Sequence, residues 1–149
     1  MPRSGARVKR DYRVWRSPAL ERDMELLVFG EEGTPVIVFP TSMGRFYQWE
    51  DVGMVAHLAP RIEAGLLRLW CVDSVDGESF YNREASAPDR ARRHLAYDRY
   101  LTEEVVPAAK DAANGAGLVL AGASFGAFHA ANIALRHPGV ARAAICLSG

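Results

Sequence analysis

The chain has 149 residues, of which 49% are hydrophobic and 24% are charged. This is enough apolar sequence for one globular domain with a real core, and it excludes a disordered or membrane-spanning chain. Lys plus Arg equal Asp plus Glu at 18 each, so no net charge favours nucleic acid or an anionic membrane. We therefore expect a small-molecule partner, and the composition leaves the oligomeric state open.

The N-terminal stretch MPRSGARVKRDYRVWR is basic but lacks the apolar region of a secretory signal. We interpret it as a solvated tail that leads into a strand. Taken as the native start, it predicts a cytoplasmic protein.

The two cysteines, Cys71 and Cys146, each lie in an apolar, strand-like run. Such positions predict buried free thiols rather than a disulfide or a metal pair. No CxxC or HExxH spacing occurs, so no metal site is expected.

Two strands are predicted near the N-terminus, at residues 11–16 and 24–29. The stretch GEEGTP after the second strand supplies turn chemistry, and the two strands are expected to form an antiparallel hairpin. Four later runs are short, continuously apolar and bounded by Gly or Pro, which is typical of strands buried on both faces. These runs are PVIVFP, LLRLWCVD, GLVLAG and ARAAICLSG.

Helical patterns lie between these runs, at residues 48–63, 89–113 and 127–136. In the second, Asp89 is the expected N-cap and Pro107 is expected to kink the helix. Alternating strands and helices predict an α/β fold, in which a mostly parallel sheet is covered by helices on both faces. We expect a single domain over residues 1–149, and its one long loop, SVDGESFYNREASAP, is expected to carry function.

Ser124 is the candidate nucleophile, because GASFG at residues 122–126 fits the G-x-S-x-G pattern between an apolar strand and a helix. A strand that turns straight into a helix strains the residue at its apex, and side chains at positions 122 and 126 would collide with adjoining backbone. The hydroxyl is then presented at the N-terminus of the helix, where N–H groups favour a developing oxyanion. Phe125 N–H is the expected first donor.

A second oxyanion donor is expected from the loop TSMGRFYQWED, which follows the strand PVIVFP and faces the elbow in such folds. Ser42 N–H is the preferred candidate, with Thr41 and Met43 as near alternatives. A loop that only contacts solvent is the other interpretation.

Four stretches, in an order and spacing that run through nearly the whole chain, resemble one family of α/β-hydrolases. They are FPTSMGRFYQWED, VDGESFYN, YLTEEVVP and GASFGAFHAANIALRHPGVARAAICLSG. The family is the group of esterases that includes S-formylglutathione hydrolase and the mycobacterial mycolyltransferases. The resemblance implies the α/β-hydrolase fold and a loop in which Ser79, Phe80 and Tyr81 line the substrate cleft. A loop merely anchored by its two aromatic residues is the alternative.

The chain departs from this family at Pro40-Thr41, where His-Gly or Asp-Gly often stands. We also expect Trp49, Tyr81 and Phe125 to lie near one cleft at the C-terminal side of the sheet, where ligands bind in open α/β folds.

The catalytic base is harder to place, because the triad of α/β-hydrolases runs Ser, then Asp or Glu, then His along the chain. After Ser124 the sequence offers only His129 and His137, and no acidic residue. Neither is expected within hydrogen-bond reach of Ser124 Oγ, because they lie about a turn and a half and about 20 Å along the next helix. We interpret His137 as a helix C-terminal residue that favours the dipole, and His57 and His94 as packing or surface residues.

The final run ARAAICLSG would form an apolar strand at an unpaired sheet edge, which natural proteins avoid. We therefore expect the N-terminal portion of a longer hydrolase, truncated after its sixth strand, with the triad Asp and His downstream. A degenerate, non-catalytic scaffold is the alternative.

The sequence thus predicts a serine carboxylester hydrolase in which Ser124 attacks an ester or thioester carbonyl, without a metal or organic cofactor. Residues 1–149 alone are expected to be inactive. The rival hypothesis is a binding or structural domain that keeps the elbow only as architecture. Acyl and alcohol specificity cannot be read from the residues.

Overall fold

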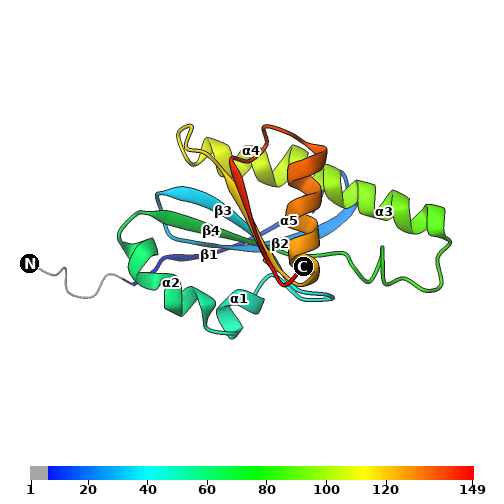
Figure 1. Cartoon of the computed structure of the whole chain (residues 1–149), viewed down its shortest axis with the longest axis horizontal. Helices are drawn as coiled ribbons and strands as arrows, with labels where there is room; N and C mark the ends of the chain where they lie inside the picture. The colour runs from blue at the N-terminus through cyan, green and yellow to red at the C-terminus, as the bar shows by residue number, and fades with distance from the viewer. Residues whose placement is uncertain (1–6) are drawn as a thin grey trace, which may run out of the picture.

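The computed structural model describes residues 7–149 and shows a six-stranded sheet with helices on both faces (Figure 1). The predicted α/β class, with its N-terminal antiparallel hairpin, is confirmed. The strands are β1 (Arg10–Ser17), β2 (Arg22–Phe29), β3 (Thr34–Phe39), β4 (Leu67–Val72), β5 (Val119–Ala123) and β6 (Ala143–Leu147).

The strand order is β1-β2-β4-β3-β5-β6. β1 pairs with β2 and β2 with β4 in antiparallel fashion, whereas β4, β3, β5 and β6 are mutually parallel. Val38 of β3 pairs with Cys71 of β4, and Phe39 pairs with Gly122 of β5. The carboxyl ends of these three strands therefore meet at one edge of the sheet, and the loops that leave them converge there.

The helical segments are α1 (Gln48–Asp51), α2 (Met54–Glu63), α3 (Ala87–Arg99), η1 (Tyr100–Val105), α4 (Val106–Asp111) and α5 (Phe125–Arg136). The single helix expected over residues 48–63 is wrong. Gly53 adopts a left-handed φ of 83° between α1 and α2, a conformation that ends a helix and suits glycine. No helix in the described part of the chain is long and apolar enough to cross a membrane.

The long central helix also differs from its expectation. Its N-cap is Ser86, whose Oγ accepts a hydrogen bond from Asp89 N–H, so the expected Asp89 cap is wrong by one turn. Asp89 lies in the first turn instead and completes the cap by accepting from Ser86 Oγ. Near Pro107 the helix widens into the π-helical segment η1, which lies where the proline ring would clash with the preceding turn.

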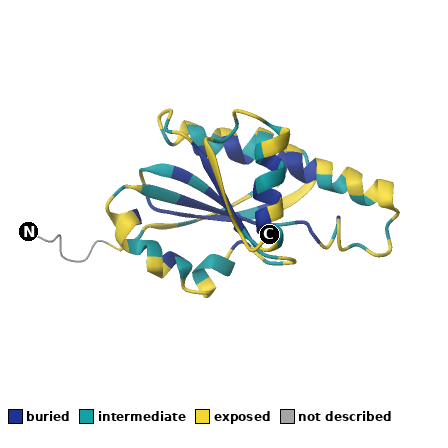
Figure 2. Cartoon of the chain, in the orientation of Figure 1, coloured by how far each residue is buried: buried dark blue, intermediate teal, exposed yellow. Residues whose placement is uncertain are grey.

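The core consists of two clusters, one on each face of the sheet. Alternate residues along one strand point to opposite faces: Leu26 and Val28 of β2 join the cluster beneath α3, η1, α4 and α5, whereas Leu27 and Phe29 join the cluster beneath α1 and α2. Figure 2 shows buried strands at the centre of the sheet between these helical layers.

β6 lies at the edge of the sheet, as expected, and pairs only with β5 in the described chain. All five of its residues are exposed (Figure 2). The expectation of two buried thiols is therefore half wrong: Cys71 is buried in the sheet, and burial raises the pKa of its thiol to about 12, but Cys146 is exposed because β6 is an edge strand.

Candidate active site

Ser124 occupies a tight turn between β5, which ends at Ala123, and α5, which begins at Phe125. Its φ of 55° and ψ of −123° are unusual for a residue with a side chain, and such strain costs about 1–3 kcal/mol unless neighbours impose it. Here Ser124 N–H donates to Leu147 O at 2.8 Å and Ser124 O accepts from Ala127 N–H at 3.0 Å. The strained geometry predicted for the serine is confirmed, and its side chain is exposed at the N-terminus of α5.

The two glycines that flank the turn are required by close backbone contacts. A Cβ on Gly122 would lie 2.3 Å from the carbonyl carbon and oxygen of Gly126, and a Cβ on Gly126 would lie 2.5 Å from Phe39 O and 2.6 Å from Pro40 O. These distances are too short for any real side chain. The start of α5 is therefore pressed onto the end of β3, beside the loop that begins at Pro40.

The loop after β3 leaves one of its three candidate oxyanion donors free. Thr41 N–H donates to Gln48 Oε1 at 2.8 Å, and Met43 N–H donates to Asp76 Oδ2 at 3.1 Å. Within residues 7–149, Ser42 N–H and Phe125 N–H have no hydrogen-bond acceptor. Of these three amides, that of Ser42 is therefore the one without an acceptor in the described residues, and its role as an oxyanion donor stays a prediction.

Side chains from three segments meet beside the serine. The ring of Phe125 lies 5.5 Å, between centroids, from both Phe80 and Tyr81, and Tyr81 Oη lies 2.8 Å from Ser42 Oγ. Phe80 also packs edge-on against Phe128 at 5.5 Å. Because Phe80 and Tyr81 are each more than two-fifths exposed, this aromatic cluster has a face open to solvent.

Two other expected substrate residues lie elsewhere. Ser79 is buried and its Oγ donates to Val75 O at 3.0 Å, so its hydroxyl stabilises the loop rather than facing a cleft. Trp49 is partly buried and packs against the core cluster beneath α1 and α2. The structure therefore does not bring Trp49 together with Tyr81 and Phe125.

A buried carboxylate and imidazole lie beneath the aromatic cluster, and sequence reasoning missed the carboxylate. Asp76 Oδ1 and His129 Nε2 are 3.0 Å apart, and both side chains are at most 2% exposed. His129 is surrounded by rings, with centroid distances of 4.7 Å to Phe125 and 5.2 Å to Tyr97. The available signal was the position of Asp76, which closely follows a buried strand at the carboxyl edge of the sheet.

The other three histidines make no hydrogen bond to Ser124 in the described part of the chain. His94 Nε2 is 3.2 Å from Asn132 Nδ2, and burial together with the neighbouring His129 lowers the pKa of His94. His137 Nε2 lies 2.8 Å from Asp98 Oδ1 at the far end of α5. His57 is exposed on α2.

An apolar cavity of about 350 Å³ opens beside the aromatic cluster. It lies between the loop after β4 and the first turns of α3, and Phe80 and His94 form part of its wall. The complete lining is Phe80, Ala87, Arg90, Ala91, His94 and Leu95. Phe80 lines the cavity and also contacts Phe125, so the Phe80 ring lies between the cavity and the residue that follows Ser124.

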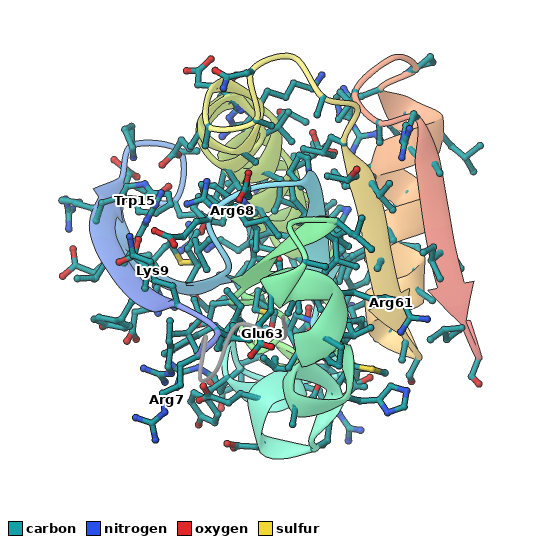
Figure 3. The ribbon with its side chains drawn as sticks, turned by 90° about the vertical axis from the view of Figure 1, so that its left-hand side faces the viewer. Arg7, Lys9, Trp15, Arg61, Glu63 and Arg68 are labelled. Carbon is teal, nitrogen blue, oxygen red and sulfur yellow. The ribbon has the colours of Figure 1, made fainter. Side chains whose placement is uncertain are left out.

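A second, larger cavity of about 420 Å³ lies at the opposite edge of the sheet, near the amino ends of the parallel strands. Its wall includes Arg7 and Glu63, which Figure 3 shows among other charged side chains at this end of the molecule. The cavity holds none of the residues that surround Ser124, so its size does not make it the site.

The comparisons with known proteins identify the family and the fold of the chain. The family described as Putative esterase matches residues 17–149. A search of the curated proteins finds no match. Solved structures with low sequence identity share the fold, and three of them serve as examples.

The S-formylglutathione hydrolase from Agrobacterium tumefaciens is 18% identical, with a TM-score of 0.68 over 93% of this chain and 57% of its own. The CE1 ferulic acid esterase from Anaeromyces mucronatus is 14% identical, with a TM-score of 0.70 over 96% and 60%. A fluorophosphonate-binding serine hydrolase from Staphylococcus aureus is 13% identical, with a TM-score of 0.60 over 93% and 56%.

The chain spans less than two thirds of the length of each of these structures. They share its α/β-hydrolase fold, and the family match covers β2 to β6, the serine turn and the loops around it. The chain therefore belongs to this esterase family.

Proposed function

We propose that Ser124 is the nucleophile of a serine carboxylester hydrolase and that this chain supplies the nucleophile and the oxyanion hole. The observation that carries the proposal is the strained, exposed serine at the N-terminus of α5, held by glycine contacts that exclude any side chain. The esterase family and its hydrolase neighbours support ester hydrolysis in general.

In this proposal, Ser124 Oγ loses its proton to a base and attacks the carbonyl carbon of an ester or thioester. The carbonyl oxygen becomes an oxyanion, which accepts hydrogen bonds from Phe125 N–H and Ser42 N–H. The tetrahedral intermediate collapses to an acyl-serine, and the alcohol or thiol leaves with a proton. Water then attacks the acyl-serine, releasing the acid and restoring the serine hydroxyl.

We propose that the base and its acidic partner come from a part of the complete protein outside these residues. His129 is paired with Asp76, His94 contacts Asn132, and His137 is paired with Asp98. This assignment is compatible with the share of the solved hydrolases that the chain covers, 57% in the first example.

The substrate is proposed to be a small ester with an apolar acyl or alcohol group. The cavity beside Phe80 is of a size that holds such a group, and its wall is mainly apolar and aromatic. The name of one structural neighbour, a ferulic acid esterase, is in keeping with an aromatic group at this place.

A fluorophosphonate probe tests the nucleophile. The complete protein should be labelled, Ser124→Ala should not, and Ser86→Ala, which removes an exposed hydroxyl at the N-cap of α3, should be labelled at the wild-type rate. A folded complete protein that resists the probe would favour the rival, non-catalytic domain.

A second experiment tests the source of the base. Purified residues 1–149 should hydrolyse p-nitrophenyl acetate no faster than the same residues carrying Ser124→Ala, because a serine without its triad partners is left with only about 10³- to 10⁴-fold residual acceleration over water. Clear Ser124-dependent turnover would instead locate the base inside this chain.

A further inference from the structure

Asp76 connects three segments that the proposed oxyanion hole requires to be in fixed positions. Its own segment follows β4. Its Oδ2 accepts from Met43 N–H in the loop after β3 at 3.1 Å, and its Oδ1 lies 3.0 Å from His129 Nε2 in α5. Asp76 is 1% exposed. These two contacts therefore offset the free-energy cost of removing its carboxylate from water.

The contact with Met43 fixes the peptide next to the proposed second donor. Residues Thr41 to Gly44 form a turn, in which Gly44 N–H donates to Thr41 O at 2.9 Å and Met43 has a positive φ of 59°. With Thr41 N–H held by Gln48 and Met43 N–H held by Asp76, the Ser42 N–H between them is the one left free to point at a ligand.

The contact with His129 fixes the helix that carries the first donor. His129 lies five residues after Ser124, on the first turns of α5, and it is packed against Phe125 at a centroid distance of 4.7 Å. Its ring is also packed against Phe39 at 5.8 Å, at the end of β3. Asp76 therefore couples the helix of the first donor to the loop of the second.

We propose that Asp76, through His129 and Met43 N–H, is a positioning residue that sets the spacing of the two oxyanion donors. This inference rests on the proposed function of Ser124. It assigns Asp76 and His129 no proton transfer with substrate, so it differs from a role for His129 as the base.

The test compares three variants of the complete protein. Asp76→Ala removes both contacts. Asp76→Asn retains both, because its amide oxygen accepts from Met43 N–H and its NH₂ donates to the neutral His129 in the tautomer whose Nε2 accepts. Asp98→Ala is the matched control, since it removes another buried carboxylate that is paired with a histidine: Asp98 of α3 contacts the half-buried His137 at the C-terminal end of α5, far from the serine.

The expected loss in Asp76→Ala is about 10²- to 10³-fold in kcat, as for removal of one oxyanion donor, with KM changed by no more than about threefold. Endpoint labelling by a fluorophosphonate should remain complete while its rate falls. The preference for an ester over the matching thionoester should also fall, because sulfur is the weaker hydrogen-bond acceptor. Asp76→Asn should recover most of the rate and Asp98→Ala should keep the preference.

Hydrogen exchange gives a readout that does not depend on activity. The Met43 amide should exchange faster in Asp76→Ala than in the wild type, and should be unchanged in Asp98→Ala. An unchanged Met43 amide, or equal losses on ester and thionoester, would overturn the positioning role. If the wild type shows no Ser124-dependent hydrolysis, the proposed function fails, whereas the exchange result still decides whether Asp76 holds this loop.

Discussion

Replacing Gly126 with alanine should push α5 away from the end of β3. The new Cβ would meet Phe39 O at 2.5 Å and Pro40 O at 2.6 Å, whereas ordinary contacts begin at 3.4 Å. Both obstacles are backbone atoms, so no side-chain rotation can relieve the overlap. The first turn of α5, with Phe125 N–H, must shift by the better part of an ångström relative to β3 and its loop.

The size of the effect follows from two opposing terms. Overpacking of this kind costs about 1–3 kcal/mol, and the better helix propensity of alanine offsets at most about 1 kcal/mol. We therefore expect the free energy of unfolding to fall by about 1–2 kcal/mol. Because a displacement of about 1 Å in a catalytic group can cost 10²-fold in rate, kcat/KM should fall by about that factor.

Urea denaturation and hydrolysis of p-nitrophenyl acetate by the complete protein measure the two effects. Gly53→Ala is the matched control: its φ is +83°, and a Cβ there would meet nothing within 4 Å. The free energy of unfolding of Gly53→Ala should fall by about 1–2 kcal/mol through backbone strain alone, and its activity should be unchanged. A fully active Gly126→Ala variant, or an equal loss of activity in Gly53→Ala, would refute the reasoning.

Three further predictions concern the cavity, a histidine and a structural anchor. Ala91→Trp should fill the cavity of about 350 Å³. KM for p-nitrophenyl hexanoate should then rise by about tenfold or more, because each CH₂ of the acyl chain that is left unburied loses about 0.8 kcal/mol of binding free energy. KM for p-nitrophenyl acetate, the control substrate, should change little. Burial lowers the pKa of His94 from 6.5, so the unfolded state binds its proton more tightly and stability is lost as the pH falls below about 6.5. Thermal unfolding of His94→Gln should therefore depend less on pH between 7 and 5, and an unchanged slope would contradict this. Glu104→Ala removes the acceptor of Ser17 Oγ and Ala19 N–H. The free energy of unfolding, measured by urea denaturation, should fall by about 1–3 kcal/mol, and kcat for ester hydrolysis should not change.

Much of the fold could be predicted from the sequence because its signals are local. Each of the six strands is an apolar or alternating run ended by Gly, Pro or a polar turn, and each was found within a few residues of its expected place. The errors lie at helix ends. Gly53 breaks one helix by adopting a left-handed φ of 83°, and Ser86 displaced Asp89 as a cap, because an extended backbone and a free Oγ suit that position.

The part of the site that could be predicted is the part set by neighbouring residues in the sequence. The strain at Ser124 follows from a strand that turns directly into a helix, and the glycine spacing around it is visible in the residues. Which N–H of the loop after β3 stays free was not visible. That depends on Gln48 and Asp76, which take the amides on either side of Ser42.

The pairing of Asp76 with His129 joins residues that are 53 positions apart, and no periodicity links them. His129 lies on the buried face of α5, is 1% exposed and is surrounded by aromatic side chains. Packing does not remove the need of a buried ring nitrogen for a hydrogen-bond partner. The carboxyl edge of the sheet offers two buried carboxylates after β4, and Arg45 Nε already binds Asp73 at 3.1 Å. Asp76 is the remaining one, so asking what a buried histidine binds would have found the residue that joins the loop after β3 to α5.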